Sequence, residues 1–377
     1  MIVLFRATVE RIFSQSRKGY WEFELHTLSL VSVCPAPLSI LRIFIVSQSL
    51  RVASEVIPCN TDGMILEVKE NEVLAPHTVY KIGGPARFFV EAKNADDVRT
   101  AFLYAVKRGL PFFILGAGSN ILVSDKGFDG LVIKMTSGEV RVDGERLIAD
   151  GGIMMARVAG EATRAGLAGF EWGIGIPGTV GGSVRGNAGC FGGEMKGVIE
   201  SAHIFNIRKS DFRILKNVEC EFAYRDSIFK RRPEWVILSA TFKLKKDVPG
   251  AIQERIKYIT AERTGKQDIG TKSCGCIFKN VSWDRIDHDR KFLLARHDVL
   301  TKFKDNATVP AAFLIDECSL KGTRIGRVYV SRKHANFFVN EGGAAAREVV
   351  MLVSLVKNVV RKKFGIMLEE EIQYVGF

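Results

Sequence analysis

Residues 112–120 read Phe112-Phe-Ile-Leu-Gly-Ala-Gly-Ser-Asn120, four apolar residues that lead directly into a glycine turn. A short apolar run that ends in turn residues predicts a buried strand. Asn94 is a good helix cap, and Gly109 is a good stop signal, so we expect a helix between them. A polar-ended strand at 87–92 precedes that helix. The order is therefore strand, helix and strand, with a glycine turn at the end of the second strand.

A second glycine-rich stretch follows, because twelve of the 36 glycines lie between Gly166 and Gly197. Glycine adds no side-chain bulk and allows positive φ, which suits a backbone that approaches a flat or phosphorylated ligand. Tight turns in a β-rich domain explain the same composition, so this pattern alone leaves both interpretations open. Between the two stretches, Asp143-Gly144 predicts the turn of a hairpin.

The composition sets broad limits on the class of protein. The 377 residues favour two or three domains, and hydrophobic residues at 47% with charged residues at 25% are typical of a globular chain. No uninterrupted apolar run reaches 18 residues, which argues against an ordinary membrane span. Seven scattered cysteines favour reduced thiols and a cytoplasmic protein over a disulfide framework.

The formal net charge of +12 is compatible with nucleic acid, a membrane surface or an anionic small molecule as partner. A nucleic-acid-binding protein would show aromatic residues interleaved with Lys and Arg, or a known module, and the sequence shows neither. We therefore expect no nucleic-acid partner and no membrane span.

The first 63 residues differ from the rest. They hold two of the 36 glycines, show no clean periodicity and lack a convincing signal peptide. We interpret residues 1–63 as a disordered or non-native extension and expect Met64 to be a natural start, because every motif described below lies after it.

The C-terminal part predicts a helix followed by a strand. The helix has an apolar stripe and ends at Gly365. The strand covers residues 366–375, where Glu369, Glu370 and Glu371 follow one another. Both faces of this strand mix apolar and charged residues, so one glutamate is expected to be partly buried, and a buried carboxylate is either paired or functional.

Several motifs, taken in order, resemble one enzyme family. They read Ile82-Gly-Gly-Pro-Ala, Leu115-Gly-Ala-Gly-Ser-Asn-Ile-Leu-Val, Gly175-Ile-Pro-Gly-Thr-Val-Gly-Gly-Ser, Asn187-Ala-Gly, Tyr224-Arg-Asp-Ser-Ile-Phe-Lys, Cys274-Gly-Cys-Ile-Phe-Lys-Asn, Leu314-Ile-Asp, Leu320-Lys-Gly, His334-Ala-Asn-Phe and Leu368-Glu-Glu-Glu-Ile. This ordered set resembles the UDP-N-acetylenolpyruvoylglucosamine reductase (MurB) family, in its shorter-loop subclass, from about Met64 to the C-terminus.

The resemblance implies an α+β protein. Its FAD-binding fold has two subdomains, of the vanillyl-alcohol-oxidase or PCMH-like type, and a C-terminal α/β domain binds the UDP-sugar. Subdomain 1 would cover 64–135 with the C-terminal strand 366–377, subdomain 2 would cover 136–267, and the UDP-sugar domain would cover 268–365. The implied activity is that of a UDP-N-acetylmuramate dehydrogenase of peptidoglycan synthesis. NADPH reduces FAD, and hydride then passes to the enolpyruvyl group of the UDP-sugar.

The resemblance also implies which residues contact FAD. Two glycine loops would hold its diphosphate and neighbouring parts through backbone N–H groups, as such loops do for anions. The expected cofactor contacts are Gly116, Ala117, Gly118, Ser119, Asn120, Gly175, Pro177, Gly178, Thr179, Gly181, Gly182 and Asn187.

Three further residues are implied to be catalytic. Hydride addition pushes negative charge onto the substrate carboxylate, which in the family an arginine and a glutamate serve, here Arg225 and Glu371. Glu371 should have a raised pKa, because one of two neighbouring carboxyl groups must carry or share a proton. The alternative interpretations are a surface ion pair for Arg225 and a strand-edge charge for Glu371, with Glu369 and Glu370 as rivals.

The proton donor would be Cys276, where many family members have serine. A free cysteine thiol, with a pKa of about 8.5, is a stronger acid than a hydroxyl. The alternatives are a metal ligand together with Cys274 or an inert buried thiol, and no zinc-like spacing supports a metal. Phe191 and Val281 also depart from the usual tyrosine and proline of the family.

Tyr224, Lys279, Asn280, His334 and Asn336 are the expected substrate contacts. Two other functions stay open at this point. One is an oxidase of the same flavin fold that acts on an alcohol or a sugar lactone, and the other is a basic nucleic-acid-binding protein.

Overall fold

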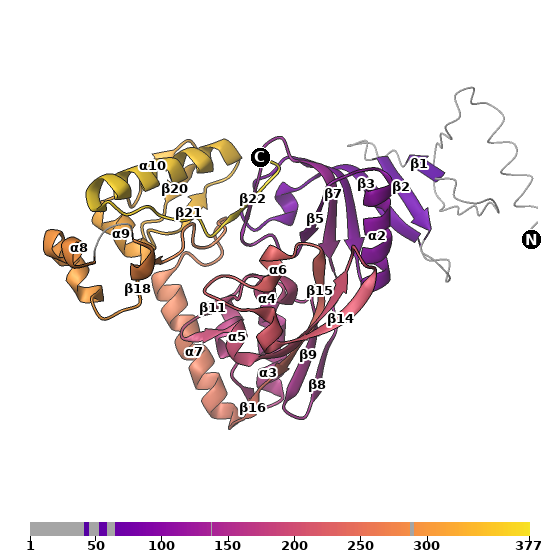
Figure 1. The fold of residues 1–377 in the computed structure, drawn as a ribbon, viewed down its shortest axis with the longest axis horizontal. Helices are drawn as coiled ribbons and strands as arrows, with labels where there is room; N and C mark the ends of the chain where they lie inside the picture. Colours follow the sequence, from indigo (N-terminus) through magenta and orange to yellow (C-terminus); the bar gives the residue numbers. More distant parts are fainter. Residues whose placement is uncertain (1–40, 45–52, 59–64, 137, 287–289) are drawn as a thin grey trace, which may run out of the picture.

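Two β-sheets lie next to each other in the computed structural model, and a third, C-terminal part stands at one end of the molecule (Figure 1). The structure describes residues 41–44, 53–58, 65–136, 138–286 and 290–377. Within these residues no helix combines the length and the apolar character needed to cross a bilayer. The described residues form both helices and strands, in the α+β architecture that was expected.

The first sheet has the strand order β1-β2-β3-β4-β7-β5. Its strands are β1 (Leu41–Phe44), β2 (Ala53–Pro58), β3 (Ile65–Val73), β4 (Pro85–Ala92), β5 (Phe112–Leu115) and β7 (Phe128–Met135). Helix α2 (Ala95–Lys107) connects β4 to β5, and both strands pair in parallel with β7. Asn94 caps α2, since its side chain accepts a hydrogen bond from the Asp97 N–H over 2.9 Å. The predicted strand, helix and strand are thus confirmed.

The segment expected to be an extension, 1–63, lies mostly outside the described residues. The described parts of it are β1 and β2. These two strands pair antiparallel with each other, and β2 also pairs with β3, so they continue the edge of the first sheet.

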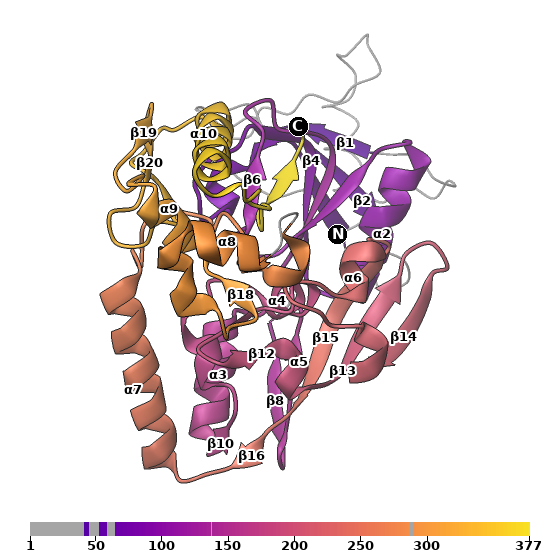
Figure 2. The ribbon, with the colours of Figure 1, turned by 60° about the vertical axis from the view of Figure 1, so that its left-hand side comes forward.

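The second sheet is antiparallel, with the order β14-β13-β15-β9-β8. Its strands are β8 (Val140–Asp143), β9 (Arg146–Asp150), β13 (Ile199–Asn206), β14 (Asp211–Lys216) and β15 (Trp235–Lys243). The predicted hairpin at Asp143-Gly144 is the β8–β9 pair. Helices α3 (Met155–Arg164), α4 (Val180–Arg185) and α7 (Pro249–Lys266) accompany this sheet, and α7 leads along its side to the C-terminal part (Figure 2).

Short elements connect the larger ones of the two sheets. They are η1 (Ala75–His77), β10 (Leu167–Ala168), η2 (Glu171–Gly175), β11 (Gly189–Cys190), β12 (Gly193–Glu194), α5 (Met195–Val198), η3 (Asn217–Cys220), α6 (Ile228–Arg231) and β16 (Lys245–Lys246).

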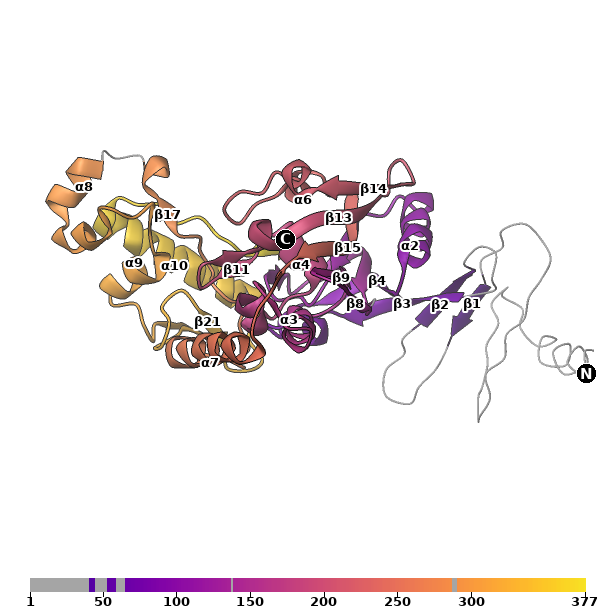
Figure 3. The ribbon, with the colours of Figure 1, turned by 90° about the horizontal axis from the view of Figure 1, so that it is seen from below.

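The C-terminal part packs around helix α10 (Ala346–Phe364). The apolar stripe of α10 is buried at Val349, Leu352, Val353, Val356 and Val360, and Gly365 ends the helix with φ +72°, as predicted. The other elements are β17 (Val281–Ser282), η4 (Trp283–Arg285), α8 (Arg290–Arg296), η5 (Asp298–Phe303), β18 (Thr308–Val309), α9 (Ala311–Glu317), β19 (Arg324–Ile325), β20 (Val328–Val330) and β21 (Phe338–Asn340). Figure 3 shows this part at one end and β1 to β3 towards the other.

The final strand is shorter than predicted. Strand β22 covers only Gln373–Val375 and pairs in parallel with β6 (Ile121–Val123). The prediction of a strand over 366–375 was wrong, because residues before β22 leave the sheet and contact another segment. The N–H of Lys279 donates to the carbonyl of Glu369 (2.9 Å), and the N–H of Glu371 donates to the carbonyl of Ile277 (2.8 Å). This irregular course explains why alternation failed for the three glutamates.

Candidate active site

The two glycine loops lie against each other. A Cβ added to Gly116 would sit 2.5 Å from the Thr179 Oγ1 atom, and one added to Gly178 would sit 3.6 Å from the Ser119 Oγ atom. Gly118 has φ +63°, and a Cβ there would lie 2.6 Å from the His77 carbonyl oxygen. Glycine is therefore required here by the packing of the protein itself, and this packing brings the loops at 116–120 and 175–183 together.

The first glycine loop has the donors that a diphosphate needs. Within the described residues, the N–H groups of Ala117, Gly118 and Ser119 donate no hydrogen bond. On the facing loop, Thr179 caps α4, and its side chain accepts from the Gly182 N–H over 3.3 Å. Free N–H groups in a glycine turn form a concave anion site. These residues therefore fit the diphosphate of FAD, while Gly181 is held by the Gly151 carbonyl at 2.9 Å.

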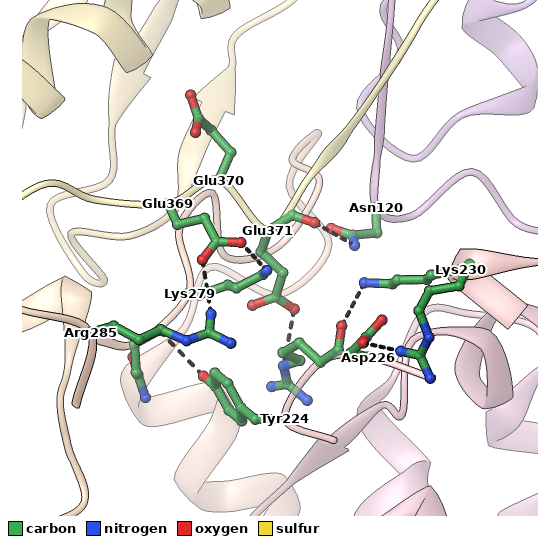
Figure 4. Close-up of polar contacts among 12 residues, drawn as sticks. Asn120, Tyr224, Asp226, Lys230, Lys279, Arg285, Glu369, Glu370 and Glu371 are labelled. Carbon is green, nitrogen blue, oxygen red and sulfur yellow. Dashed lines mark hydrogen bonds and ion pairs between the residues drawn. The ribbon is translucent and has the colours of Figure 1, made fainter. Parts of the chain in front are cut away.

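The first glycine loop also adjoins Glu371. The Asn120 side-chain amide donates to the Glu371 carbonyl over 3.2 Å (Figure 4). The Gln373 N–H donates to the Asn120 carbonyl over 3.0 Å. A cofactor held by residues 116–120 would thus lie beside the segment that carries Glu371.

Arg225 is presented by a tight turn. Ala223 and Asp226 close this turn with two reciprocal backbone hydrogen bonds of 3.0 and 3.1 Å. Arg225 itself has φ +54°, an unfavourable conformation for a residue with a side chain. Lys230 stabilises it, since the Lys230 ammonium donates to the Arg225 carbonyl over 2.5 Å. The strained backbone conformation thus occurs at the residue that places its guanidinium in the candidate site.

Asn187 supports the same turn. Its buried side-chain amide donates to the Ala223 carbonyl and to Glu194 Oε2, both over 3.0 Å, and its side-chain oxygen accepts from the Lys196 N–H. These bonds use both side-chain N–H groups. The Asn187 side chain thus positions this turn. The cofactor contact expected of Asn187 from sequence stays a prediction.

Arg225 and Glu371 form a largely buried ion pair, with 3.1 Å between Arg225 Nε and Glu371 Oε1. The contact is an ion pair, because the Nε–H has no acceptor among the described residues that meets the distance and angle of a hydrogen bond. Burial raises the pKa of the Glu371 carboxyl, and Arg225, Lys230 and Lys279 lower it only in part. The direction of this shift agrees with the expectation from sequence.

Cys276 lies beside this pair. Burial and, to a smaller degree, the Glu371 charge raise the pKa of its thiol to about 12, and the charges of Arg225 and Arg263 oppose this rise. The thiol therefore stays protonated at neutral pH. Asn336 is buried and bonded to the Phe278 N–H and carbonyl at 2.9 and 2.8 Å, and its own carbonyl accepts from the Ile277 N–H over 2.9 Å. Asn336 thus holds the backbone that follows Cys276.

Three of the other expected substrate contacts, Tyr224, Lys279 and Asn280, lie together on the more exposed side of the site. Lys279 pairs with Glu369, and its charge also acts on Glu371. Tyr224 is 49% exposed, and its hydroxyl accepts from the Asn280 N–H over 3.3 Å. The Asn280 side chain caps α9 by accepting from the Ala311 N–H.

His334 is linked to this group through a neighbour. It lies near Ser331, Asp268 and Lys321 and contacts the ring of Phe337, which pairs through its backbone with Cys276. Its contact with the substrate stays a prediction. Within the described residues, no cluster of three His, Cys, Asp or Glu side chains could hold a metal ion.

Sequence reasoning missed Arg263 and Cys190. Arg263 donates to the Cys190 sulfur over 3.3 Å, and its charge lowers the pKa of Cys276 against burial. A Cβ on Gly175 would overlap the Arg263 side chain, so Gly175 makes room for it. Arg263 lies in an ordinary charged helix, and no local pattern marks it, because only the fold brings α7 to the glycine loop.

Two family models match the chain. An FAD binding domain matches residues 86–205, and the C-terminal domain of UDP-N-acetylenolpyruvoylglucosamine reductase matches residues 267–375. Among curated relatives, the UDP-N-acetylenolpyruvoylglucosamine reductase of Caldanaerobacter subterraneus subsp. tengcongensis is 35% identical over 81% of this chain and 93% of its own length. That of Solibacter usitatus is 34% identical over 82% of this chain and 97% of its own length.

A solved structure is also similar. The crystal structure of UDP-N-acetylenolpyruvylglucosamine reductase from Thermus caldophilus matches with a TM-score of 0.65 and 30% sequence identity. The match covers 82% of this chain and 99% of that one.

Proposed function

The chain belongs to the UDP-N-acetylenolpyruvoylglucosamine reductase family, and we propose that Arg225, Cys276 and Glu371 carry the substrate half of its reaction. The reaction is the NADPH-dependent, FAD-mediated reduction of UDP-N-acetylglucosamine enolpyruvate to UDP-N-acetylmuramate, a step of peptidoglycan precursor synthesis. The observation that carries the assignment of residues is the convergence of these three side chains beside the glycine loop at 116–120.

FAD, when bound, supplies the hydride that it has taken from NADPH. The chain supplies the cradle for its diphosphate at 116–120 and 178–182, with Pro177 and Gly175 shaping the approach of the second loop. Asn120 links that cradle to the Glu371 segment. The cofactor and the acidic group therefore share one rigid support.

Arg225 stabilises the charge that develops on the substrate carboxylate. Its Nε–H has no directed acceptor among the described residues, and its guanidinium is largely buried, where an electrostatic contact is worth more than in water. Because the αL backbone fixes the direction of the side chain, the guanidinium needs no rearrangement when the charge appears.

Cys276 donates the proton that completes the reduction. Its raised pKa keeps the thiol in the protonated form that a general acid requires. Proton transfer to the substrate carbon leaves a thiolate, which Arg225 and Arg263 stabilise, and solvent then restores the proton.

Glu371 controls how the substrate carboxylate is received. In its protonated form it can donate a hydrogen bond to that carboxylate, and in its ionised form it repels it. The burial that raises its pKa therefore favours substrate binding.

The domain assignment follows the same reasoning. The pairing of β22 with β6 supports a first FAD-binding subdomain of 64–135 that includes the C-terminal strand, with 136–267 as the second subdomain and 268–365 as the UDP-sugar domain. Five free cysteines among the described residues support a reducing, cytoplasmic location.

The test of the proposed function is an NADPH oxidation assay. Purified protein should bind a flavin and oxidise NADPH only when UDP-N-acetylglucosamine enolpyruvate is added, and UDP-N-acetylmuramate should appear in equal amount. Replacement of Arg225, Cys276 or Glu371 should impair the step with the sugar nucleotide more than the step with NADPH.

A further inference from the structure

Glu369 lies between two cations, Lys279 and Arg285, on the more exposed side of the site. Its Oε1 atom is bound by the Lys279 ammonium, and its Oε2 atom lies 3.2 Å from Arg285 Nη1 (Figure 4). The Glu369 and Arg285 side chains are 55% and 73% exposed, whereas that of Lys279 is only 19% exposed. The hydrogen bond from Lys279 holds the pKa of Glu369 below its usual range, so this carboxylate is ionised at neutral pH.

The region around Glu369 carries more positive than negative charge. Arg225, Lys230 and Lys279 act on Glu371, and Arg285 acts with Lys279 on Glu369. These four cations face Glu369 and Glu371 and, beside Lys230, also Asp226, so positive charges outnumber negative ones among these described residues. Burial further favours the neutral form of Glu371. The excess charge suits a ligand with a carboxylate at one end and further negative charges nearby.

Glu369 is not needed to hold its own segment in place. The N–H of Lys279 donates to the Glu369 carbonyl over 2.9 Å, so the backbone fixes this crossing without the side chain. The neighbouring Glu370 points elsewhere and pairs with Lys357 at 3.0 and 3.1 Å. An exposed ion pair contributes little to stability, so a stronger anion can displace the Glu369 carboxylate.

We infer that Arg285 and Lys279 bind the diphosphate of the ligand, and that the Glu369 carboxylate occupies this diphosphate position until the ligand displaces it. This inference rests on the proposed function, which supplies a UDP-sugar as substrate. The Arg285 guanidinium can bind phosphate oxygens with two N–H groups, and Lys279 adds a point charge from the buried side. Arg285 is then a residue that selects nucleotide-linked sugars, and it acts outside the reacting atoms.

Besides FAD, whose diphosphate is assigned to the glycine loops, two ligands of the enzyme carry a diphosphate, the UDP-sugar and NADPH. The test therefore has separate arms for them. In one arm, UDP and UMP are titrated by calorimetry into the oxidised holoenzyme. In the other, the concentration dependence of flavin reduction by NADPH is followed by stopped flow.

Arg285→Ala should weaken UDP binding by up to about fivefold and UMP binding much less, because loss of one charged contact at an exposed site costs on this scale. Glu369→Gln should strengthen UDP binding by a few-fold at low salt, since it removes the competing anion. In the double variant the gain from Glu369→Gln should shrink, because part of the competition is for Arg285.

Matched controls come from neighbouring residues. Arg290→Ala removes a cation that stacks on Trp283 with 4.9 Å to the ring centroid, and Glu370→Gln removes the carboxylate that pairs with Lys357. Both should leave UDP binding unchanged. If Arg285→Ala changes both the binding of UDP and the concentration dependence of flavin reduction by NADPH, the site binds both diphosphates. If Arg285→Ala changes only the binding of UDP, the site binds the sugar nucleotide.

Equal affinities of the wild-type protein and the Arg285→Ala variant for UDP would overturn this inference and leave the proposed function intact. Weaker UDP binding by Glu369→Gln overturns it as well, because that carboxylate would then help the ligand. A wild-type protein that binds no UDP overturns the proposed function together with the inference.

Discussion

Arg225 and Glu371 approach to 3.1 Å although they reach the site from unrelated parts of the chain. Arg225 comes from the strained turn between Ala223 and Asp226, and Glu371 comes from the irregular segment before β22. The approach joins the second glycine-rich region, which supports the turn through Asn187, to the first glycine loop, which supports Glu371 through Asn120. The pair is therefore the point at which the supports of both glycine-rich regions meet, and it is here that we propose the substrate binds.

Arg225→Ala should slow the step with the sugar nucleotide by about a hundredfold or more, the scale of one lost contact to a developing charge in a buried site. The step with NADPH should change little, because the hydride is taken up before the enolpyruvyl group arrives. Stopped-flow absorbance of the flavin separates the two steps. Equal loss in both steps would mean that Arg225 acts on structure, and Arg225→Lys serves as the variant that keeps the charge.

Cys276→Ser should keep part of the activity, whereas Cys276→Ala should stall the step with the sugar nucleotide and leave the step with NADPH intact. A hydroxyl can replace the thiol as donor, and a methyl group cannot. Full activity of Cys276→Ala in the same stopped-flow assay would exclude Cys276 as the proton donor.

The raised pKa of Cys276 predicts an unusual pH dependence of alkylation. With a pKa of about 12, the thiolate fraction is very small at neutral pH. Loss of activity with iodoacetamide should therefore accelerate about tenfold per pH unit and continue to do so above pH of about 9, where an ordinary thiol with pKa of about 8.5 levels off. Bound substrate should protect. Cys274→Ala is the control, because Cys274 is buried and should not be the reactive thiol.

The raised pKa of Glu371 predicts how KM for the sugar nucleotide changes with pH. Its folded-state pKa is raised, so the carboxyl stays protonated to a higher pH than a free glutamate and then ionises. Below that pKa it can donate to the substrate carboxylate, and above it the two negative charges repel. KM should therefore rise as pH increases through the raised pKa of Glu371. Glu371→Gln should flatten this rise, and an unchanged profile would show that another group titrates.

Gly118 and Gly144 make a matched pair for the cofactor loop. Both have positive φ, +63° and +60°, but a Cβ on Gly118 would lie 2.6 Å from the His77 carbonyl oxygen, whereas Gly144 has nothing within 4 Å. Gly144→Ala should cost about 1 kcal/mol, the strain of the left-handed backbone alone. Gly118→Ala should cost more and should release FAD. Thermal unfolding and the flavin content of the purified protein check both, and equal losses would show that the contact with His77 adds nothing to the backbone strain.

Local sequence signals predicted much of the fold. Asn94, Gly109 and Gly365 marked helix ends through capping chemistry that acts within a few residues, and Asp143-Gly144 marked a hairpin. The strand expected at 366–375 was wrong over most of its length, because the partner of residues 369–371 is the distant segment 277–279, and no local pattern encodes that crossing.

The residues of the candidate site also fall into those that the sequence predicted and those that it did not. Arg225, Cys276 and Glu371 were predicted from motifs that resemble a family, and the fold brings them together. Arg263 and Arg285 were not predicted, because their surroundings in sequence are ordinary charged residues. His334 lies near Asp268 and Lys321 and contacts Phe337, and its expected contact with the substrate stays a prediction. Tertiary contacts alone decide which of many similar charges faces the ligand.

Transfer of hydride from reduced FAD to an enolpyruvyl sugar nucleotide is the step on which every assignment at this site depends. It is measured by mixing anaerobically reduced holoenzyme with UDP-N-acetylglucosamine enolpyruvate and following the absorption band of the oxidised flavin. We expect the band to return and UDP-N-acetylmuramate to form in equal amount, whereas UDP-N-acetylglucosamine, which lacks the enolpyruvyl group, should have no effect. A flavin that stays reduced in the presence of the enolpyruvyl substrate would rule out this route for the hydride.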